Sequence, residues 1–425
     1  MINKIIALTA ILISISGFSQ RNNISPYSTF GIGEIYDAKS VAEQSMGGIG
    51  TGINSQYRLT FSNPASLSYL KYTVYTLAGA NNYTKIDNGT TQQSSSSFSL
   101  SYLTLGFPVG KNGGASFGLQ PYSKVGYKIL SRELNEVFES ESDLFRGKGS
   151  NNRVFIGYGH KLPYQISVGF EASYIFGNLE RTILHRNENR LEERATLYKT
   201  TSEINGFAFK IGAQNTLKIN NKINLKTGLS FSLNNKINDH VIESVISLLN
   251  SPNPDIIIPR EQILERNFTA RVNMPLKTVL SIGTGKDNKW YLGYEYSYQK
   301  AVSFSNTFTQ NNNNIRYDKS YNASFGGFYI PKVESITNYW SRVTYRAGLH
   351  LKKTGLVVNN TDIKDFGISF GVSLPSKRQL SNINLGFDIG NRGEINNSGL
   401  IKENYYNFRL SLSLNDKWFK KRKLD

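Results

Sequence analysis

The chain has 425 residues, a formal net charge of +18, no cysteine and 12% aromatic residues. A disulfide scaffold and a thiolate metal site are excluded by the missing cysteine, and the aromatic content argues against intrinsic disorder. A helical membrane protein needs runs of about 20 apolar residues, and the one long apolar run stands at the start of the chain.

The first 19 residues have the pattern of a secretory signal peptide. Lys4 supplies the positive charge, residues 5–15 form the apolar core, and Gly17 and Ser19 are the small residues of a cleavage site. The alternative, a single membrane anchor, needs about 20 apolar residues. We therefore expect export and cleavage near Ser19–Gln20.

Residues 20–71 do not alternate in polarity. A short helix can form at 38–46, a glycine-rich run follows at 47–52, and Asn63-Pro64-Ala65-Ser66 is a turn signal. Such a segment can hang in the periplasm or fold into a barrel lumen as a hatch, because a barrel wider than about eight strands has room for one.

Residues 72–414 alternate between apolar and small polar residues. In 366–374, Phe366, Ile368 and Phe370 alternate with glycine and serine. Alternation suits both a soluble sandwich and a membrane barrel. Export, strands longer than the usual five or six residues, and turns that are alternately short and long favour the barrel.

The pattern predicts an all-β fold, a 14-stranded antiparallel transmembrane β-barrel with both termini in the periplasm. Pro108, Pro163, Pro331 and Pro375 fall in its short turns, where no ladder hydrogen bond is lost. The predicted strands are 72–83, 96–107, 114–128, 151–162, 165–179, 201–218, 223–236, 268–285, 289–304, 316–330, 338–352, 365–374, 381–391 and 403–414.

Two features are expected at the periplasmic side. Trp290, Trp340 and Trp418 would form an interfacial aromatic belt. Residues 415–425 form a basic tail that either binds anionic lipid or remains solvated.

A basic strip is predicted on strand 338–352. Its cationic residues alternate with apolar ones and would line the lumen: Arg342, Arg346, His350 and Lys352. The strip either guides an anionic head group or forms ion pairs with the hatch residues Glu34, Asp37 and Glu43.

The long loop 237–267 carries aliphatic residues at helical spacing. We expect a short extracellular helix at 239–250, capped by Asp239. Its apolar face must be buried, so the helix would cover the barrel, line a ligand groove or dock a partner. The residues concerned are Val241, Val245, Leu248 and Leu249.

Features of an enzyme, a cofactor site or a metal site are not evident. The four histidines, 160, 185, 240 and 350, have no metal-binding spacing. The glycines at 48–52 lack the flanking strand and helix of a dinucleotide site. Export also removes the context in which a basic chain would bind nucleic acid.

The glycine run, Asn63-Pro64-Ala65-Ser66 and the first strand together resemble the FadL/TodX family of outer-membrane barrels. Residues 327–331 and 345–349 look like a late periplasmic hairpin of that family, and 384–419 resembles a branch from bacteria with type IX secretion. The resemblance implies passive uptake of small, fatty-acid-like hydrophobic compounds across a Gram-negative outer membrane. The alternative, implied by PorV-like relatives, is a non-transporting barrel that partners a secretion or assembly complex.

Overall fold

The computed structural model describes residues 25–134, 140–188, 194–220, 222–249, 251, 253, 255–304, 314–376, 381–396 and 399–417. The predicted signal peptide and residues 418–425 of the predicted basic tail, Trp418 included, lie outside the described residues, whereas Asn415 and Asp416 belong to the last strand.

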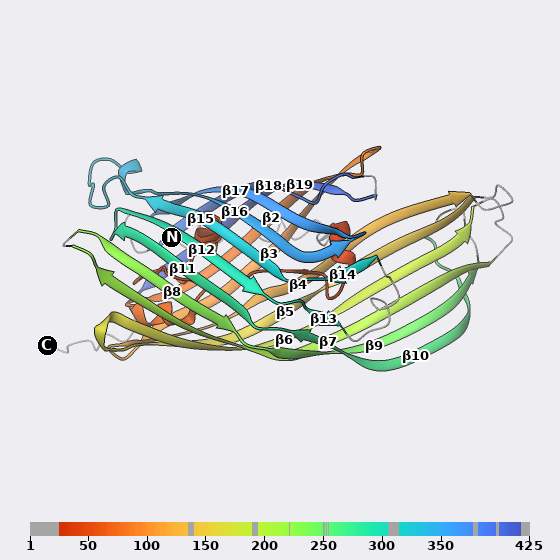
Figure 1. The fold of residues 1–425 in the computed structure, drawn as a ribbon, viewed down its shortest axis with the longest axis horizontal. Helices are drawn as coiled ribbons and strands as arrows, with labels where there is room; N and C mark the ends of the chain where they lie inside the picture. The colour runs from red at the N-terminus through yellow and green to blue at the C-terminus, as the bar shows by residue number, and fades with distance from the viewer. Residues whose placement is uncertain are drawn as a thin grey trace, which may run out of the picture.

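The described chain forms one closed antiparallel sheet of nineteen strands. One strand, β1 (Glu34–Ile35), belongs to the N-terminal segment, and four passages through the wall are each divided into two strands, so the predicted 14-stranded barrel is confirmed. Figure 1 shows the strands tilted around a common axis. The first and last wall strands close the barrel in continuous register, from Thr73↔Asp416 to Asp87↔Lys402.

The wall strands have the following bounds: β2 (Thr73–Asp87), β3 (Gln92–Val109), β4 (Gly113–Leu134), β5 (Ser140–Lys161), β6 (Ile166–Asn187), β7 (Arg194–Lys218), β8 (Asn224–Ser232), β9 (Asn235–Leu249), β10 (Pro259–Met274), β11 (Lys277–Lys286), β12 (Trp290–Gln299), β13 (Ser303–Phe304), β14 (Ile315–Tyr317), β15 (Ser320–Tyr329), β16 (Thr344–Val358), β17 (Thr361–Pro375), β18 (Asn382–Arg392) and β19 (Lys402–Asp416). The divided passages are β8 with β9, β10 with β11, β12 with β13, and β14 with β15.

Polarity alternates along the wall strands as a lipid-facing barrel requires. On β17, Phe370 is 50% exposed, whereas its neighbour Ser369 is fully buried. On β19, Leu410 is 47% exposed and Ser411 is buried. The outer face is therefore aliphatic and aromatic, and small polar residues face inward.

The wall is much taller on one side than on the other (Figure 1). β4, β5 and β6 have 22 residues each and β7 has 25, whereas β18 has 11. A tilted strand crosses a bilayer with about 9–11 residues, so the tall strands continue beyond it as a projection. Much of 129–150, 180–200 and 237–267, predicted as loops, is therefore strand.

The helix predicted at 239–250 is wrong, because residues 239–249 belong to β9. β9 pairs with β7 on one side and with β10 on the other. Both faces of β9 carry apolar residues, which removes the two-residue alternation and gives a spacing that imitates a helix.

No helix among the described residues has the length and apolar character needed to cross a membrane. The helical elements are α2 (Val41–Gln44) and the 3-10 turns η2 (Pro26–Thr29), η3 (Pro64–Tyr69), η4 (Pro163–Gln165) and η5 (Trp340–Arg342).

β3 and β4 are paired over only part of their length in the wall. Their pairing ends at Leu103↔Leu119, and further along β4 its edge pairs with β1 instead, Ser123 lying opposite Ile35. The N-terminal segment thus supplies part of the sheet that β3 leaves unpaired.

Candidate functional site

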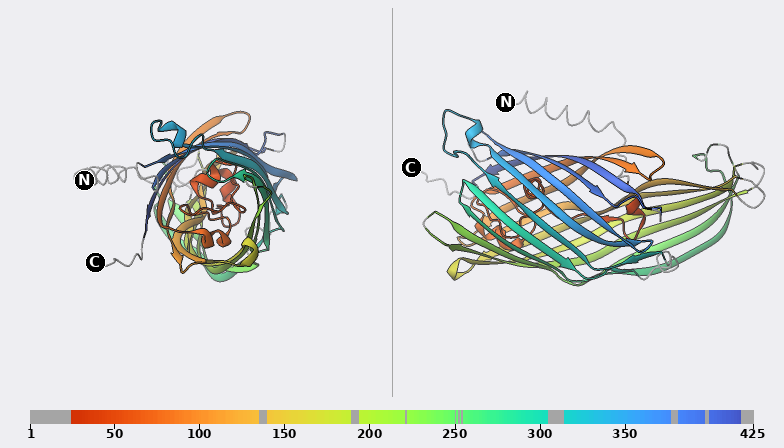
Figure 2. Two further views of the ribbon diagram at one scale, coloured as in Figure 1. Left: turned by 90° about the vertical axis from the view of Figure 1, so that its left-hand side faces the viewer. Right: turned by 45° about the horizontal axis from the view of Figure 1, so that its top comes forward.

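The segment 25–71, called the hatch from here on, lies inside the barrel (Figure 2, red). Its short helix α2 begins with a capping box, in which Ser40 and Glu43 bond reciprocally to each other's backbone N–H groups. Glu43 also accepts hydrogen bonds from the backbone of Phe61 and Ser62, so one carboxylate joins α2 to the stretch that leads into η3.

Asn63, the first residue of the predicted hatch motif, connects the hatch to the wall. Its Nδ2 donates to the carbonyl oxygens of Thr51 at 3.0 Å, Ala213 at 3.0 Å and Leu229 at 3.2 Å. Its Oδ1 accepts from the N–H of Ala65 at 3.0 Å and so caps η3. Pro64, Ala65 and Ser66 are all buried in η3.

Glycines on the inner wall allow the hatch backbone to approach closely. A Cβ at Gly169 would lie 2.3 Å from Ala65 N, one at Gly228 would lie 2.2 Å from Thr51 O, and one at Gly348 would lie 2.1 Å from the carbonyl carbon of Met46. The same holds on β4 and β15 at Gly114 and Gly326. The small inner-face residues are therefore contact positions for the hatch.

The glycine run of the hatch is held by a buried carboxylate of β12. Glu295 accepts hydrogen bonds from the N–H groups of Gly50 at 2.9 Å and Thr51 at 2.8 Å. Its other oxygen lies 2.6 Å from Lys39 Nζ. Charge-assisted bonds of this kind are stronger than neutral ones.

Further ion pairs cross the lumen. Arg392 lies 2.8 Å from hatch residue Glu34 and 3.1 Å from Asp365, while Lys277 pairs with Asp37 of the hatch. Burial alone would raise the pKa of Asp37, but the cations of Lys277, Lys352 and Lys39 hold that pKa below its ordinary value. A cavity of about 160 Å³ beside Asp37, Lys39 and Lys277 is thus lined by charges.

The predicted basic strip is divided by the structure. Arg342 lies in η5, before β16 begins, with its guanidinium 5.3 Å from the Tyr339 ring centroid, so its place on the strip is wrong. His350 contacts Asp365 at 3.3 Å and Lys352 lies 4.0 Å from Asp37. Arg346 is buried and donates to Ser373 at 2.6 Å.

An apolar cavity of about 240 Å³ lies on the extracellular side of the hatch. Residues 29–31 of the hatch form one side of it, and Tyr127, Phe145, Ile183 and Val241 contribute from the wall. Arg181 donates a hydrogen bond to the Gly31 carbonyl and so ties the hatch to the wall at this cavity. Its size and lining suit a small apolar molecule.

The four residues predicted as a gate or docking helix lie on strand β9 and separate between its faces. Val241 lines the apolar cavity, and Val245 and Leu249 share its parity along the strand. Leu248 belongs to the opposite face and packs with Leu144, Leu184, Ala195 and Leu197. The four residues therefore do not form one shared apolar face, as the predicted helix would require.

Two residues of the predicted aromatic belt lie at the end of the barrel with the short turns. Trp290 begins β12, and Trp340 begins η5, where it is 64% exposed. Their role as an interfacial anchor stays a prediction.

The inward acids Glu171 and Glu295 were missed at the sequence level. Buried Glu171 lies 2.9 Å from buried Arg153 and 3.5 Å from half-buried Lys210. A carboxylate on an inner-facing position of a strand was the available signal. Within the described ranges no group of three or more His, Cys, Asp or Glu residues could hold a metal ion.

A family model described as BamG matches residues 1–425. No curated protein matches the chain. Among solved structures, the CymD monoaromatic hydrocarbon channel is 12% identical, with 90% of this chain and 99% of that chain covered and a TM-score of 0.57. The Pseudomonas putida toluene transporter TodX is 14% identical, with 91% and 100% covered and a TM-score of 0.56. A FadL homologue of Pseudomonas aeruginosa is 12% identical, with 91% and 99% covered and a TM-score of 0.54. The likeness shows the fold, which is the FadL-type barrel that the sequence resemblance implied.

Proposed function

The chain belongs to the BamG family, and from that premise and its plugged lumen we propose a non-conducting outer-membrane barrel that serves as a partner or scaffold subunit of a secretion or assembly complex. The observation that carries this proposal is the backbone contact between wall glycines and the hatch. Gly114, Gly169, Gly228, Gly326 and Gly348 lie on five different strands.

These contacts leave the hatch little freedom to move. A solute would have to pass between backbones that already approach within the space of a missing Cβ. It would also have to cross the buried Arg153–Glu171 pair and the pair of half-buried Lys39 with buried Glu295. Separating such pairs in the lumen is costly, because each partner would lose its counter-ion away from bulk water.

The tall side of the wall offers a surface for partners. Among the described residues, β10 pairs with β13 only through Val272 and Asn273, and the backbone edge of 259–270 has no strand partner there. Ile263 and Leu264 on that strand are exposed. An open strand edge with exposed apolar side chains favours pairing with another chain.

The test is the composition of the native particle. Full-length chain carrying an epitope tag is extracted from its own membranes in a gentle detergent, and its mass and co-purifying proteins are measured. We expect a stable particle larger than one barrel and closed behaviour of the purified barrel in planar bilayers. A lone, conducting barrel would contradict the proposal.

A second candidate, uptake of small hydrophobic compounds, is favoured by the apolar cavity of about 240 Å³. Similarity in fold to the CymD and TodX channels supports the same candidate. Its test is entry of toluene into cells with and without the chain. Equal rates would leave the cavity without a transport role.

A further inference from the structure

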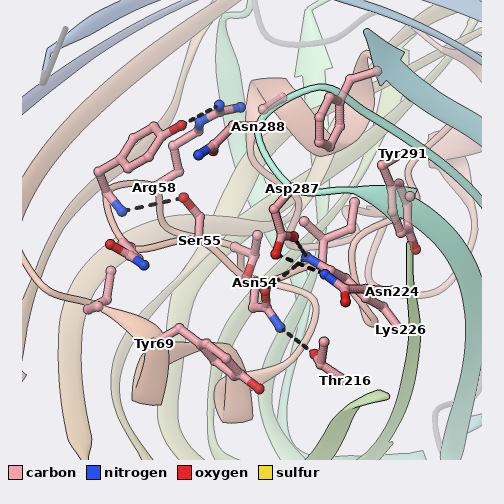
Figure 3. Close-up of a pocket in the computed structure, with 18 of the residues that line it drawn as sticks. Asn54, Ser55, Arg58, Tyr69, Thr216, Asn224, Lys226, Asp287, Asn288 and Tyr291 are labelled. Carbon is pink, nitrogen blue, oxygen red and sulfur yellow. Dashed lines mark hydrogen bonds and ion pairs between the residues drawn. The ribbon is translucent and has the colours of Figure 1, made fainter. Parts of the chain in front are cut away.

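A third, larger cavity of about 540 Å³ lies at the end of the barrel with the short turns, between the hatch and the wall (Figure 3). Eight of its lining residues are lysine or arginine and two are acidic. The cations come from the hatch and from the ends of six separate wall strands or turns, so positive charge surrounds the cavity.

Both acids of this cavity are already engaged. Glu43 accepts its hydrogen bonds from within the hatch. Asp287 lies 3.1 Å from Lys226 Nζ and accepts from Asn224 Nδ2 at 2.8 Å, as Figure 3 shows. The remaining cations have no carboxylate partner in the described part of the chain.

The guanidinium groups of Arg58 and Arg346 in this cavity have N–H donors without a hydrogen-bond acceptor among the described residues. Arg346 is 5% exposed and bonds Ser373 through Nη1, but its Nε and Nη2 are buried without a hydrogen-bond acceptor among the described residues. Arg58 Nε is in the same state, although Arg58 Nη2 donates to the Tyr57 hydroxyl at 3.3 Å. Buried donors without acceptors are costly, and charged ones most of all.

Tyr57 feels the charge of both guanidiniums. The pKa of its hydroxyl is held below the ordinary value by the charge of Arg58 first, against burial, with Arg346 acting in the same direction. Positive potential from the hatch and from β16 therefore meets at one place in the cavity.

We propose that this cavity binds an acidic polypeptide segment presented by a periplasmic partner, an inference that rests on the partner function proposed above. Planar guanidiniums match carboxylates in a bidentate geometry, so Arg58 and Arg346 anchor the segment. Lys71, Lys111 and Lys218, which line the cavity and are exposed, take further carboxylates. Cations spread around the circumference fit an extended chain better than one compact anion, and the hatch stops the chain from passing further.

The test uses the purified full-length barrel in a non-ionic detergent at low salt. Hexaglutamate is titrated by calorimetry, with hexaglutamine as the uncharged comparison. We expect hexaglutamate alone to bind, and the double variant Arg58→Gln/Arg346→Gln to bind it about tenfold more weakly or worse, since charge-assisted bonds are lost. Arg260→Gln, an exposed arginine on β10 at the opposite end, is the matched control and should bind like the wild type.

Folding of each variant is checked by its heat-modifiable mobility in a gel. The single variant Arg58→Gln, on the half-buried hatch residue, keeps the test valid if the double variant does not assemble. Equal binding of hexaglutamine, or equal affinity in wild type and variants, would overturn the assignment. Tighter binding of inorganic phosphate or of phosphatidylglycerol vesicles than of hexaglutamate would overturn it as well.

The two proposals fail separately. A barrel that binds hexaglutamate but is extracted alone contradicts the partner function. A complex that remains whole, built on a barrel indifferent to hexaglutamate, contradicts only the acidic-segment site.

Discussion

Gly212 of β7 lies so close to Asn63 of the hatch that a Cβ on the glycine would meet Asn63 Oδ1 at 1.9 Å. The same asparagine bonds to carbonyl groups of the hatch and of two wall strands. The hatch and the wall therefore have complementary surfaces that are joined by hydrogen bonds, which makes the hatch a fixed part of the barrel.

Substituting Gly212→Ala should displace Asn63 and break its bonds to the wall. Leaving buried carbonyls unsatisfied costs about 1–3 kcal/mol, so we expect a lower midpoint of urea unfolding in micelles. Gly157→Ala is the control, because there the nearest atom is the flexible Leu67 Cδ1 at 3.2 Å. Equal losses in the two variants would show that Asn63 does not depend on this contact.

Glu295 and Lys39 should contribute unequally to the free energy of unfolding. Glu295→Met leaves the N–H groups of Gly50 and Thr51 and the Lys39 cation without their acceptor, a loss of about 3–5 kcal/mol for a broken buried pair. Lys39→Met should cost less, because two backbone donors still hold the Glu295 carboxylate. Urea unfolding of both variants checks this order, and an equal or larger loss in Lys39→Met would contradict it.

Leu410 should be intolerant of charge because it faces lipid. Arginine on the lipid face of a barrel costs about 2–4 kcal/mol near the bilayer midplane, so Leu410→Arg should reduce the folded fraction in a heat-modifiability gel. Leu410→Phe keeps the surface apolar and should assemble normally. Normal assembly of the arginine variant would place Leu410 outside the hydrocarbon region.

Val241 and Leu248 should give different phenotypes, since they occupy opposite faces of β9. Val241→Phe fills part of the apolar cavity and should weaken toluene binding to the purified barrel while leaving its stability near that of the wild type. Leu248→Asn removes a buried side chain worth about 1.5–3 kcal/mol and should destabilise the projection, as measured by limited proteolysis. Matching phenotypes would mean that the two faces share one function.

Removal of the hatch should open the barrel. Deletion of 25–60 takes away the segment that fills the lumen but leaves every wall strand from β2 to β19 in place. We expect an assembled barrel with a larger conductance in planar bilayers and faster entry of small hydrophilic antibiotics. Unchanged entry would show that the wall closes without the hatch.

The barrel could be predicted from the sequence because its strands and turns are marked by patterns of residues that are neighbours in the chain. Alternation such as Phe366, Ile368 and Phe370 fixes the two faces, and the short proline-bearing turns fix the strand parity. The projection could not be predicted in this way. In β9 the inner residue Val241 and the outer residue Leu248 are both buried, so the alternation that marks a half-exposed strand is lost.

The contents of the lumen were harder to predict because they depend on contacts between distant residues. In the sequence, glycines such as Gly169 and Gly348 indicate only an inner face of small residues. Their role, which is to let the hatch backbone pack directly against the wall, depends on residues that are distant in the sequence. Glu295 pairs with Lys39, which is remote in the chain. The sequence predicts Arg346 on the inner face. That its Nε and Nη2 lack an acceptor among the described residues depends on the packing around it, which the sequence pattern does not show.

The seam between β2 and β19 has a consequence for the way the chain matures. The hatch directly precedes β2, and Asn415 on β19 donates a hydrogen bond to the Tyr57 carbonyl of the hatch at 2.8 Å. Fifteen residue pairs join β19 to β2, from Thr73↔Asp416 to Asp87↔Lys402, so this seam leaves no gap beside the hatch. We therefore expect the wall to wrap around a hatch that is already in place, so that enclosure precedes sealing during biogenesis.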